Sequence, residues 1–460
     1  MTSIFIFRRD FRLIDNIGLI ECFKNSDKIL PIFIFTPEQV ENNDFFSSNS
    51  FQFMLESLDN LNNELINNYN SQIHYYYGNN IKILKEIYEE YKYDSIYFNK
   101  DYTVYAKKRD EEIEKYCIKN NIKYNTSEDY LLSNMGLFLK KDGTPYLKYT
   151  PFKNHCKTFT IPKPDNFKFS KKKFDKIKYK FDLNVLNKYY TKNPNILVNG
   201  GRDNALKNVK NLDEFINYDS ERNDLITPTT HLSAYIKYGC VSIREVYDKI
   251  LILFGPDHGL INQLLWREFY FYLAYYNPKV FQGKSIKEDY DKIKWENKKE
   301  NIEAWKRGMT GFPGVDAGIR EMNETGYMHN RARLITSGIL IKILNVDWRI
   351  GERYFAQSLL DYDPIVNNGN WQWSSGSGAD SQEYFRIMSP WQQVITNDKE
   401  CEYIKKWIPE LKDVPAKDIL KWDETSTKYA NKVKYPKPIV DYKIMRKKIM
   451  EVYKDGLYKS

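Results

Sequence analysis

The first 130 residues alternate short apolar runs with helical segments, and this alternation restricts the fold more than any other feature. Five runs have the length of strands: residues 3–7, 29–35, 72–77, 95–99 and 122–126. Three intervals between them have apolar residues at helical spacing: residues 51–65, 81–91 and 105–118. Strands that alternate with helices form a parallel sheet with helices on both faces. The sequence therefore predicts an α/β domain with a Rossmann-like parallel sheet over residues 1–130. It has no Gly-x-Gly-x-x-Gly motif for a dinucleotide phosphate.

The pattern changes after residue 130. Residues 131–199 are rich in lysine and proline and keep no regular period, which predicts a linker that runs over the surface. From residue 200 the apolar spacing is helical, with helices predicted over residues 232–238, 260–275, 313–323, 330–344 and 348–360. Gly239 is predicted to end a helix, Ser242 and Asp347 to cap the starts of two others, and Pro313 to lie in a first turn. The predicted fold is thus an α/β domain, a linker and an all-α domain over residues 200–460.

Composition limits the class of protein. The chain is 42% hydrophobic and has a net charge of +9, an excess that permits a polyanionic partner without requiring one. Its five cysteines and five histidines show no metal-ligand spacing, and no apolar run reaches the length of a membrane span. The start of the chain has no basic region ahead of its apolar run, unlike a signal peptide. We expect a monomeric intracellular protein of a reducing compartment, cytoplasm or nucleus, without a metal and without a membrane segment.

Aromatic and polar side chains crowd together between residues 295 and 373. The stretch holds five tryptophans: Trp295, Trp305, Trp348, Trp371 and Trp373. It also holds Arg333, Asp361, Asp363 and Asn367, which a hydrophobic core would not need. The combination predicts a pocket for a large flat ligand. The alternatives are structural: an Arg333–Asp361 ion pair, and a turn made by the Asp and Asn residues.

Two features outside this stretch fit such a ligand. Thr229, Thr230 and Ser233 lie at a predicted helix start, where hydroxyls and free amides suit a phosphate but also serve as simple caps. Trp266 lies on an amphipathic helix and could stack on a nucleobase or pack in the core.

Seven motifs occur in the order in which the DNA photolyase and cryptochrome flavoproteins have them. They are FRRDFRLIDN at 7–16, WREF at 266–269, GFPGVDA at 311–317, GYMHNR at 326–331, DWR at 347–349, NNGNWQW at 367–373 and YPKPIVD at 435–441. The resemblance covers nearly the whole chain. It is closest to the class I photolyases that act on cyclobutane pyrimidine dimers.

The resemblance implies a U-shaped FAD in the helical domain. Its phosphates and ribitol would contact Tyr218, Thr229, Thr230, Leu232 and Ser233. Its ring systems would lie among Arg267, Asn330, Arg333, Asp361, Asp363 and Asn367, with Asn367 opposite flavin N5. Trp371, Trp348 and Trp295 would carry electrons from the surface to the flavin, and Trp305 would only pack. A second, antenna chromophore stays open between a deazaflavin, a flavin and none, because the acidic residue of folate-binding relatives is missing near Tyr105.

The resemblance also implies a substrate. In relatives that repair (6-4) photoproducts, two histidines that take part in proton transfer align with Asn330 and Leu334, which cannot transfer a proton. The implied reaction is light-dependent repair of UV-damaged DNA, in which photoexcited reduced FAD gives an electron to a flipped-out cyclobutane dimer and splits it into two pyrimidines. Gln263, Trp266, Asn330, Leu334 and Trp373 would surround the dimer, and Arg222, Arg331 and Arg386 would bind the DNA backbone.

Three other functions remain open on the sequence. A cryptochrome photosensor would be favoured by a long tail, but the sequence ends at Ser460, soon after the last motif. Gln263 stands where dimer photolyases usually have Glu and is more like the (6-4) branch. Residues 361–364 resemble the DASH branch, which repairs single strands, whereas 328–331 and 371–373 look more like enzymes that repair duplex DNA.

Overall fold

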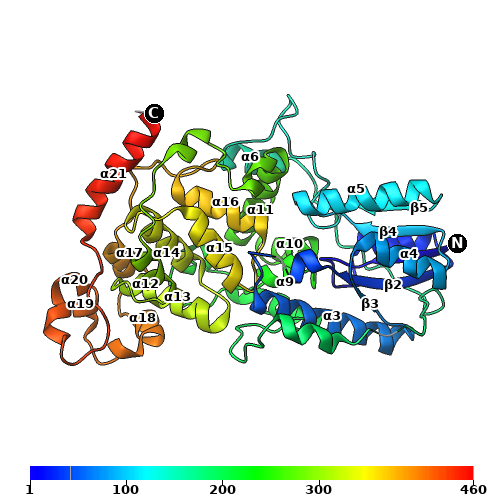
Figure 1. The fold of residues 1–460 in the computed structure, drawn as a ribbon, viewed down its shortest axis with the longest axis horizontal. Coiled ribbons are helices and arrows are strands. Elements are labelled where there is room, and N and C mark those ends of the chain that lie inside the picture. Colours follow the sequence, from blue (N-terminus) through cyan, green and yellow to red (C-terminus); the bar gives the residue numbers. More distant parts are fainter. Residues whose placement is uncertain (42, 180, 459–460) are drawn as a thin grey trace.

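The computed structural model describes residues 1–41, 43–179 and 181–458 (Figure 1). Five strands form one parallel sheet in the order β3-β2-β1-β4-β5. They are β1 Thr2–Ile6, β2 Lys28–Phe35, β3 His74–Tyr77, β4 Ser95–Asn99 and β5 Lys123–Ser127. The predicted parallel sheet is confirmed. The strand order reverses between β1 and β4, at the carboxyl edge where parallel sheets of this type usually bind ligands.

Helices cover both faces of this sheet, as the alternation predicts. They are α1 Ile17–Lys24, α2 Pro37–Val40, α3 Ser48–Tyr69, α4 Asn80–Glu90 and α5 Val104–Lys119. Neighbouring strand residues point to opposite faces, so Phe5 packs in the core shared with α3 whereas Ile4 packs in the core shared with α4 and α5. The side chains of Ser47, Asn79 and Thr103 accept backbone N–H groups at the starts of α3, α4 and α5.

The rest of the described chain is helical and contains no further named strand (Figure 1). Its α-helices are α6 Tyr149–Cys156, α7 Arg202–Lys210, α8 Tyr218–Glu221, α9 Ser233–Lys237, α10 Ile243–Phe254, α11 Gly259–Tyr276, α12 Lys299–Lys306, α13 Pro313–Thr325, α14 Asn330–Lys342, α15 Trp348–Ser358, α16 Pro364–Ser375, α17 Pro390–Asn397, α18 Glu402–Trp407, α19 Ala416–Ile419, α20 Trp422–Thr425 and α21 Tyr442–Tyr458. Short 3-10 helices span Leu183–Tyr189, Asn211–Phe215, Pro278–Gln282, Glu288–Lys292, Pro409–Leu411 and Ser426–Tyr429. No helix in the described ranges is long and apolar enough to cross a membrane.

The predicted helix ends are confirmed by their geometry. Ser242 forms a capping box with Glu245 at the start of α10, and Asp347 accepts the N–H of Arg349 at the start of α15. Gly239 has a φ of +62°, the left-handed conformation that ends α9, and Pro313 is the first residue of α13.

The connection between the two halves differs in part from its prediction. Its lysines at 171–173 are exposed or half-buried, as expected of a surface segment. However, it also contains α6, whose Tyr149, Phe152 and Cys156 are buried in one core cluster that extends from β1 to α11. These three residues recur at helical spacing, but Pro151 and the flanking lysines disguise the pattern. The domain boundaries at residues 130 and 199 therefore stay a prediction.

A buried charge network joins the sheet to the helices. Asp129, just after β5, accepts from Arg12 at 2.7 Å and from Arg244 of α10 at 2.8 Å. Asp15 accepts from Arg244 at 2.9 Å. All four side chains are nearly inaccessible to water. The network docks α10 onto the carboxyl edge of the sheet, so this edge faces the helical half of the molecule.

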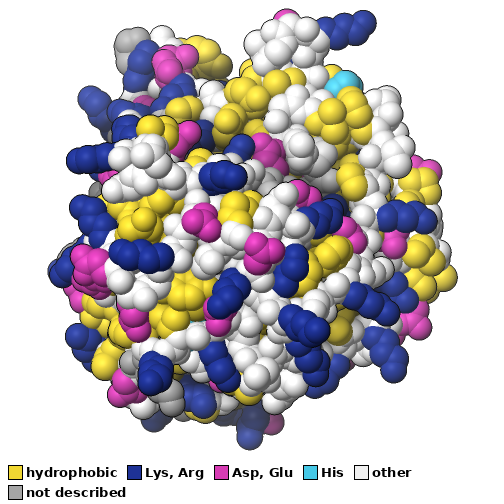
Figure 2. Space-filling model, turned by 90° about the vertical axis from the view of Figure 1, so that its right-hand side faces the viewer, with side chains coloured by type: hydrophobic (Ala, Val, Ile, Leu, Met, Phe, Trp, Pro, Cys, Tyr) yellow, Lys and Arg dark blue, Asp and Glu magenta, His cyan; other side chains and the backbone are white. Residues whose placement is uncertain are grey.

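Surface charge at the sheet end of the molecule is mixed. Figure 2 shows Lys and Arg side chains spread over this face, with Asp, Glu and apolar side chains between them. The net charge of +9 is therefore not gathered into one basic surface at this end.

Candidate cofactor and substrate pocket

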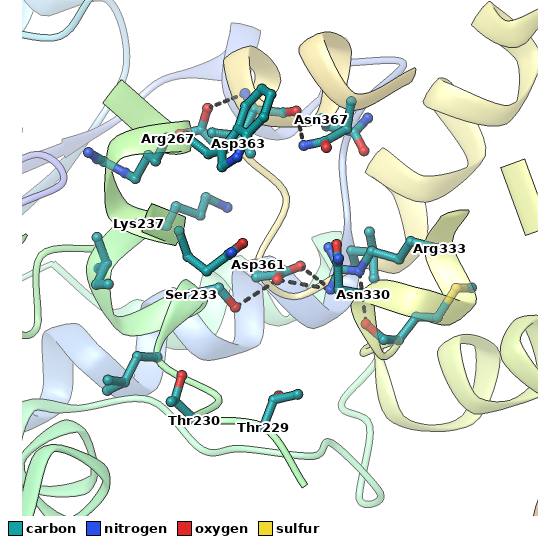
Figure 3. Close-up of a pocket in the computed structure, with 18 of the residues that line it drawn as sticks. Thr229, Thr230, Ser233, Lys237, Arg267, Asn330, Arg333, Asp361, Asp363 and Asn367 are labelled. Atoms are coloured by element: carbon teal, nitrogen blue, oxygen red, sulfur yellow. Dashed lines mark hydrogen bonds and ion pairs between the residues drawn. The ribbon is translucent and has the colours of Figure 1, made fainter. Parts of the chain in front are cut away.

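A cavity of about 520 Å³ lies between α9, α11, α14 and α16. Its volume is in the range of small-molecule and cofactor sites. Figure 3 shows polar side chains pointing into it from separate segments: Thr229 and Thr230 from the loop before α9, Arg267 from α11, Arg333 from α14 and Asn367 from α16.

The cavity brings together almost every residue that the sequence singled out. All predicted cofactor contacts line it: Tyr218, Thr229, Thr230, Leu232, Ser233, Arg267, Asn330, Arg333, Asp361, Asp363 and Asn367. So do most predicted substrate contacts and one tryptophan of the electron chain: Arg222, Gln263, Trp266, Arg331, Leu334, Trp371 and Trp373. Arg386, Trp348 and Trp295 are not among the lining residues. The role given to each residue stays a prediction.

One end of the cavity is rich in hydroxyl groups. Ser233 donates to Asp361 at 2.7 Å, and the hydroxyl of Thr229 lies 3.0 Å from that of Tyr327. His231, between them, has a φ of +51°, and its buried Nδ1 has no hydrogen-bond partner. A buried polar atom without a partner is rare and costly, so a ligand that bonds to His231 is favoured here.

Arg333 and Asp361 form the ion pair that the sequence suggested. The guanidinium donates to both carboxylate oxygens, at 2.9 and 3.1 Å, and to the carbonyl of Met328 at 2.8 Å. Burial disfavours the charged guanidinium, but Asp361 outweighs burial and raises the pKa of Arg333. The two-pronged pair thus fixes both side chains at the cavity wall.

Asp363 connects the cavity to the sheet. Its carboxylate caps α16 by accepting from Ile365 at 2.9 Å, and it forms an ion pair with Arg9, which follows β1. Burial would raise the pKa of Asp363, but Arg9 and Arg267 hold it below its ordinary value. Arg9 belongs to the motif at residues 7–16, but no role for it was predicted from the sequence. The structure shows that the carboxyl edge of the sheet positions a cavity residue.

Lys237 lines the cavity, as does Tyr130, although the sequence singled out neither residue. Lys237 donates to Ser50 at 2.6 Å and to the hydroxyl of Tyr238 at 3.0 Å, and it lies between Arg267 and Asp361 in Figure 3. Burial, with the nearby charge of Arg9, lowers the pKa of Lys237 to about 7. Its charge near neutral pH therefore depends on what occupies the cavity.

Asn367 has its amide nitrogen committed to Glu352 of α15. The amide donates to the Glu352 carbonyl oxygen at 3.1 Å and reaches its carboxylate at 3.4 Å. Glu352 is 7% exposed, and burial raises its pKa to about 7. Asn367 is thereby held against a carboxyl group that is partly protonated at neutral pH.

Glu352→Gln is expected to stabilise the protein progressively as the pH rises from about 5 to 8. The raised pKa means that the native state favours protonated Glu352, so wild-type stability falls as the pH rises from the unfolded value through about 7. The gain should reach about 2–3 kcal/mol at pH 8. Urea unfolding at several pH values measures it, with the exposed Glu303→Gln as the control. Parallel pH profiles for wild type and Glu352→Gln would contradict the assignment.

The tryptophans differ in their surroundings. Trp371 is buried at the cavity wall, with the rings of Phe355 and Trp305 at 4.9 and 6.3 Å. Trp348 is also buried, whereas Trp295 is half-buried beside Tyr453 at 5.7 Å. Trp305 is fully buried, stacks on Phe355 and donates its N–H to the Thr336 carbonyl, as expected of a packing residue.

Two arginines, Arg222 and Arg331, line the cavity. Arg331 donates to Asn223, and its buried Nε has no partner. Burial and the nearby charge of Arg222 lower the pKa of Arg331. Two arginines close enough to repel each other favour an anionic ligand. Arg386 lies apart, and its carbonyl accepts from the buried Lys342 at 3.1 Å.

The arrangement fits FAD. Hydroxyls and an unpartnered histidine nitrogen lie in the region of Thr229 and Ser233, and fixed charges and an amide lie around Arg333, Asp363 and Asn367. An elongated ligand with phosphates and planar rings could meet both regions within one cavity. Among the described residues, no group of three or more His, Cys, Asp or Glu side chains is placed to hold a metal ion.

Comparison with known proteins gives the family. The sequence profile of DNA photolyase matches residues 3–168, and that of the FAD binding domain of DNA photolyase matches residues 260–455. The deoxyribodipyrimidine photo-lyase of Buchnera aphidicola subsp. Baizongia pistaciae is 34% identical over 476 residues, covering 97% of both chains. That of Escherichia coli K12 is 29% identical over 478 residues, covering 98% of both.

Solved structures agree with these relatives. The archaeal photolyase from Sulfolobus tokodaii, solved with two FAD molecules, has a TM-score of 0.88 and 37% identity and covers 99% of this chain and 100% of its own. The class III photolyase from Agrobacterium tumefaciens has a TM-score of 0.90 and 26% identity, with coverage of 100% and 98%. The predicted fold, the photolyase-type enzyme and the FAD cofactor are thereby confirmed. The chain belongs to the DNA photolyase family and carries that family's FAD-binding domain.

Proposed function

We propose that this photolyase uses light and FAD to split cyclobutane pyrimidine dimers in UV-damaged DNA. The observation that carries the proposal is that one cavity is lined by both predicted sets of residues, one for the cofactor and one for the dimer. The second set holds Gln263, Trp266, Asn330, Leu334 and Trp373. A substrate among these residues would share the cavity with the cofactor.

The chain's own residues would bind the dimer and orient it. Reduced FAD, once bound and excited by light, would supply the electron that opens the dimer and take it back afterwards. Trp266 and Trp373 offer aromatic faces on which bases can stack. Gln263 and Asn330 offer amides that can donate to or accept from the edge of a pyrimidine. Dimer splitting needs no proton from the protein, which suits Asn330 and Leu334, since neither side chain titrates.

The substrate must leave the duplex to reach this cavity. Flipping costs a few kcal/mol and costs least for a base pair that is already distorted. FAD-loaded protein should therefore bind a duplex with one cyclobutane dimer more tightly than the same undamaged duplex, in the dark. A competition titration with the two duplexes tests this. Equal affinity for both would reject the proposed dimer pocket.

Arg331→Ala is expected to weaken binding of damaged and undamaged DNA by similar factors and to reduce the slope of log affinity against log salt by about 1. The reason is that Arg331 lines the cavity beside Arg222 with an unpartnered Nε, a position suited to a backbone phosphate. Binding titrations at several salt concentrations measure the slope. Arg307→Ala, an exposed arginine outside the cavity, is the matched control. An unchanged slope for Arg331→Ala would contradict phosphate contact.

A further inference from the structure

A stacked pair of rings connects the segment over residues 131–199 to the wall of the cavity. Tyr149, the first residue of α6, stacks on Trp266 of α11 with ring centroids 3.8 Å apart and planes within 9°. Tyr149 is 7% exposed, and its hydroxyl donates to the Asn262 carbonyl at 2.9 Å. Asn262 precedes Trp266 by one helical turn. The phenol is therefore held by the same helix that carries the indole.

This contact fixes the plane of the indole. Tyr149 covers one face of Trp266, and the ring of Phe269 meets it nearly at right angles, at 82° and 5.6 Å. The ring of Tyr270 is tilted by 36° against the indole, with the centroids 5.7 Å apart. A base that enters the cavity therefore cannot stack on the face of Trp266 that Tyr149 covers. An indole already held in its binding orientation loses less side-chain entropy when a base stacks on it.

A second contact joins Tyr149 to the loop after α16. The backbone N–H of Tyr149 donates to Asp380 at 3.1 Å, and the ammonium of Lys148 lies 3.6 Å from the same carboxylate. Asp380 follows α16, the helix that carries Trp373. Residues 148–149 thus contact both the helix of Trp266 and the loop after the helix of Trp373.

We propose that Tyr149 is a positioning residue for substrate recognition: it holds the Trp266 indole in the orientation in which a flipped pyrimidine dimer stacks on it. The inference rests on the proposed function, since it assigns Trp266 to the dimer. Discrimination between damaged and undamaged DNA therefore depends on a residue outside the predicted helical domain over residues 200–460. Tyr149 itself does not line the cavity.

Substitutions at Tyr149 test this in dark-binding titrations. Tyr149→Leu removes the ring and should weaken binding of dimer-containing duplex about three- to tenfold, the loss expected of one aromatic pair. Undamaged duplex should bind as before, and the flavin content should be unchanged. In repair assays the half-saturating DNA concentration should rise while the rate at saturation stays constant. Tyr149→Phe keeps the ring and should remain within about twofold of wild type.

Phe152→Leu is the matched control for general damage to α6. Phe152 is fully buried on the same helix and contacts Phe269 at 5.3 Å, and Trp266 is not among its ring contacts. Phe152→Leu should leave discrimination between the damaged and the undamaged duplex unchanged. The Trp266→Ala background gives the decisive comparison, because there Tyr149→Leu should have no further effect on dimer binding.

Three results would overturn the inference. One is a Tyr149→Leu loss that persists in full in the Trp266→Ala background, and another is an equal loss in Phe152→Leu. The third is that Tyr149→Leu discriminates between damaged and undamaged DNA like wild type while Trp266→Ala does not. That result would leave the proposed function intact. If Trp266→Ala itself binds damaged DNA like wild type, the proposed dimer pocket fails together with the role of Tyr149.

Discussion

Trp371→Phe is expected to slow photoreduction of bound oxidised FAD by more than about tenfold, a rise of about 1.4 kcal/mol in the barrier. Trp371 is buried and lines the cavity, and a phenyl ring gives up an electron far less readily than an indole. Repair by protein that has been reduced chemically beforehand should stay close to wild type, because that reaction needs no electron from Trp371. Absorbance of the flavin under steady illumination measures the first rate, and dimer loss from DNA the second.

Trp305→Phe is the matched control for this experiment. Trp305 is equally buried, and its ring lies 6.3 Å from that of Trp371, but it is assigned to packing alone. Its substitution should leave photoreduction near the wild-type rate. Wild-type photoreduction in Trp371→Phe, or equal slowing in both variants, would contradict the proposed electron chain.

Asp129→Asn is expected to lower the free energy of unfolding by about 3–5 kcal/mol, the usual cost of removing one partner from a buried ion pair. Asp129 accepts from both Arg12 and Arg244, and asparagine would leave two buried guanidinium groups without a full counter-charge. Because this network docks α10 onto the sheet, flavin retention should fall as well. Urea unfolding at pH 7 measures the loss of stability, with Asp142→Asn in an exposed loop as the control.

The stability difference between wild type and Asp129→Asn should also depend on pH. Burial alone would raise the pKa of Asp129, but Arg12 and Arg244 hold it below its ordinary value in the folded protein. The stability that Asp129 contributes is therefore present above the unfolded pKa of about 4 and is lost as the pH falls through the folded value. The difference between wild type and Asp129→Asn should shrink on acidification. A difference that grows with acid would contradict the ion-pair account.

The fold was largely predictable because its signals are local. Strand and helix periods in the first 130 residues predicted the sheet, and the side chains of Ser242 and Asp347 marked helix starts that the structure confirms. The Arg333–Asp361 pair could be suggested from sequence because both residues lie within the aromatic stretch. The resemblance to photolyases then suggested FAD as the ligand, and the family comparison confirms FAD as the cofactor.

The remaining features depend on contacts between distant parts of the chain. Arg9 and Asp363 are 354 positions apart, and no periodic pattern connects the end of a strand with the cap of a helix in the other half. Tyr149 and Trp266 meet only because α6 folds back onto α11, and α6 was hidden by its proline and lysines. Local propensity predicts elements, but it does not predict which buried charge or ring meets which partner.

Repair of defined lesions under light tests the central claim most directly. FAD-loaded, reduced protein would be mixed with two duplexes, one with a single cyclobutane pyrimidine dimer and one with a single (6-4) photoproduct. Each mixture would be split between blue light and darkness, and restored pyrimidines would be counted by chromatography. We expect the cyclobutane dimer to be restored in the light alone and the (6-4) product to persist. A cyclobutane dimer that stays intact under light, or repair of the (6-4) product in its place, would contradict the proposed function.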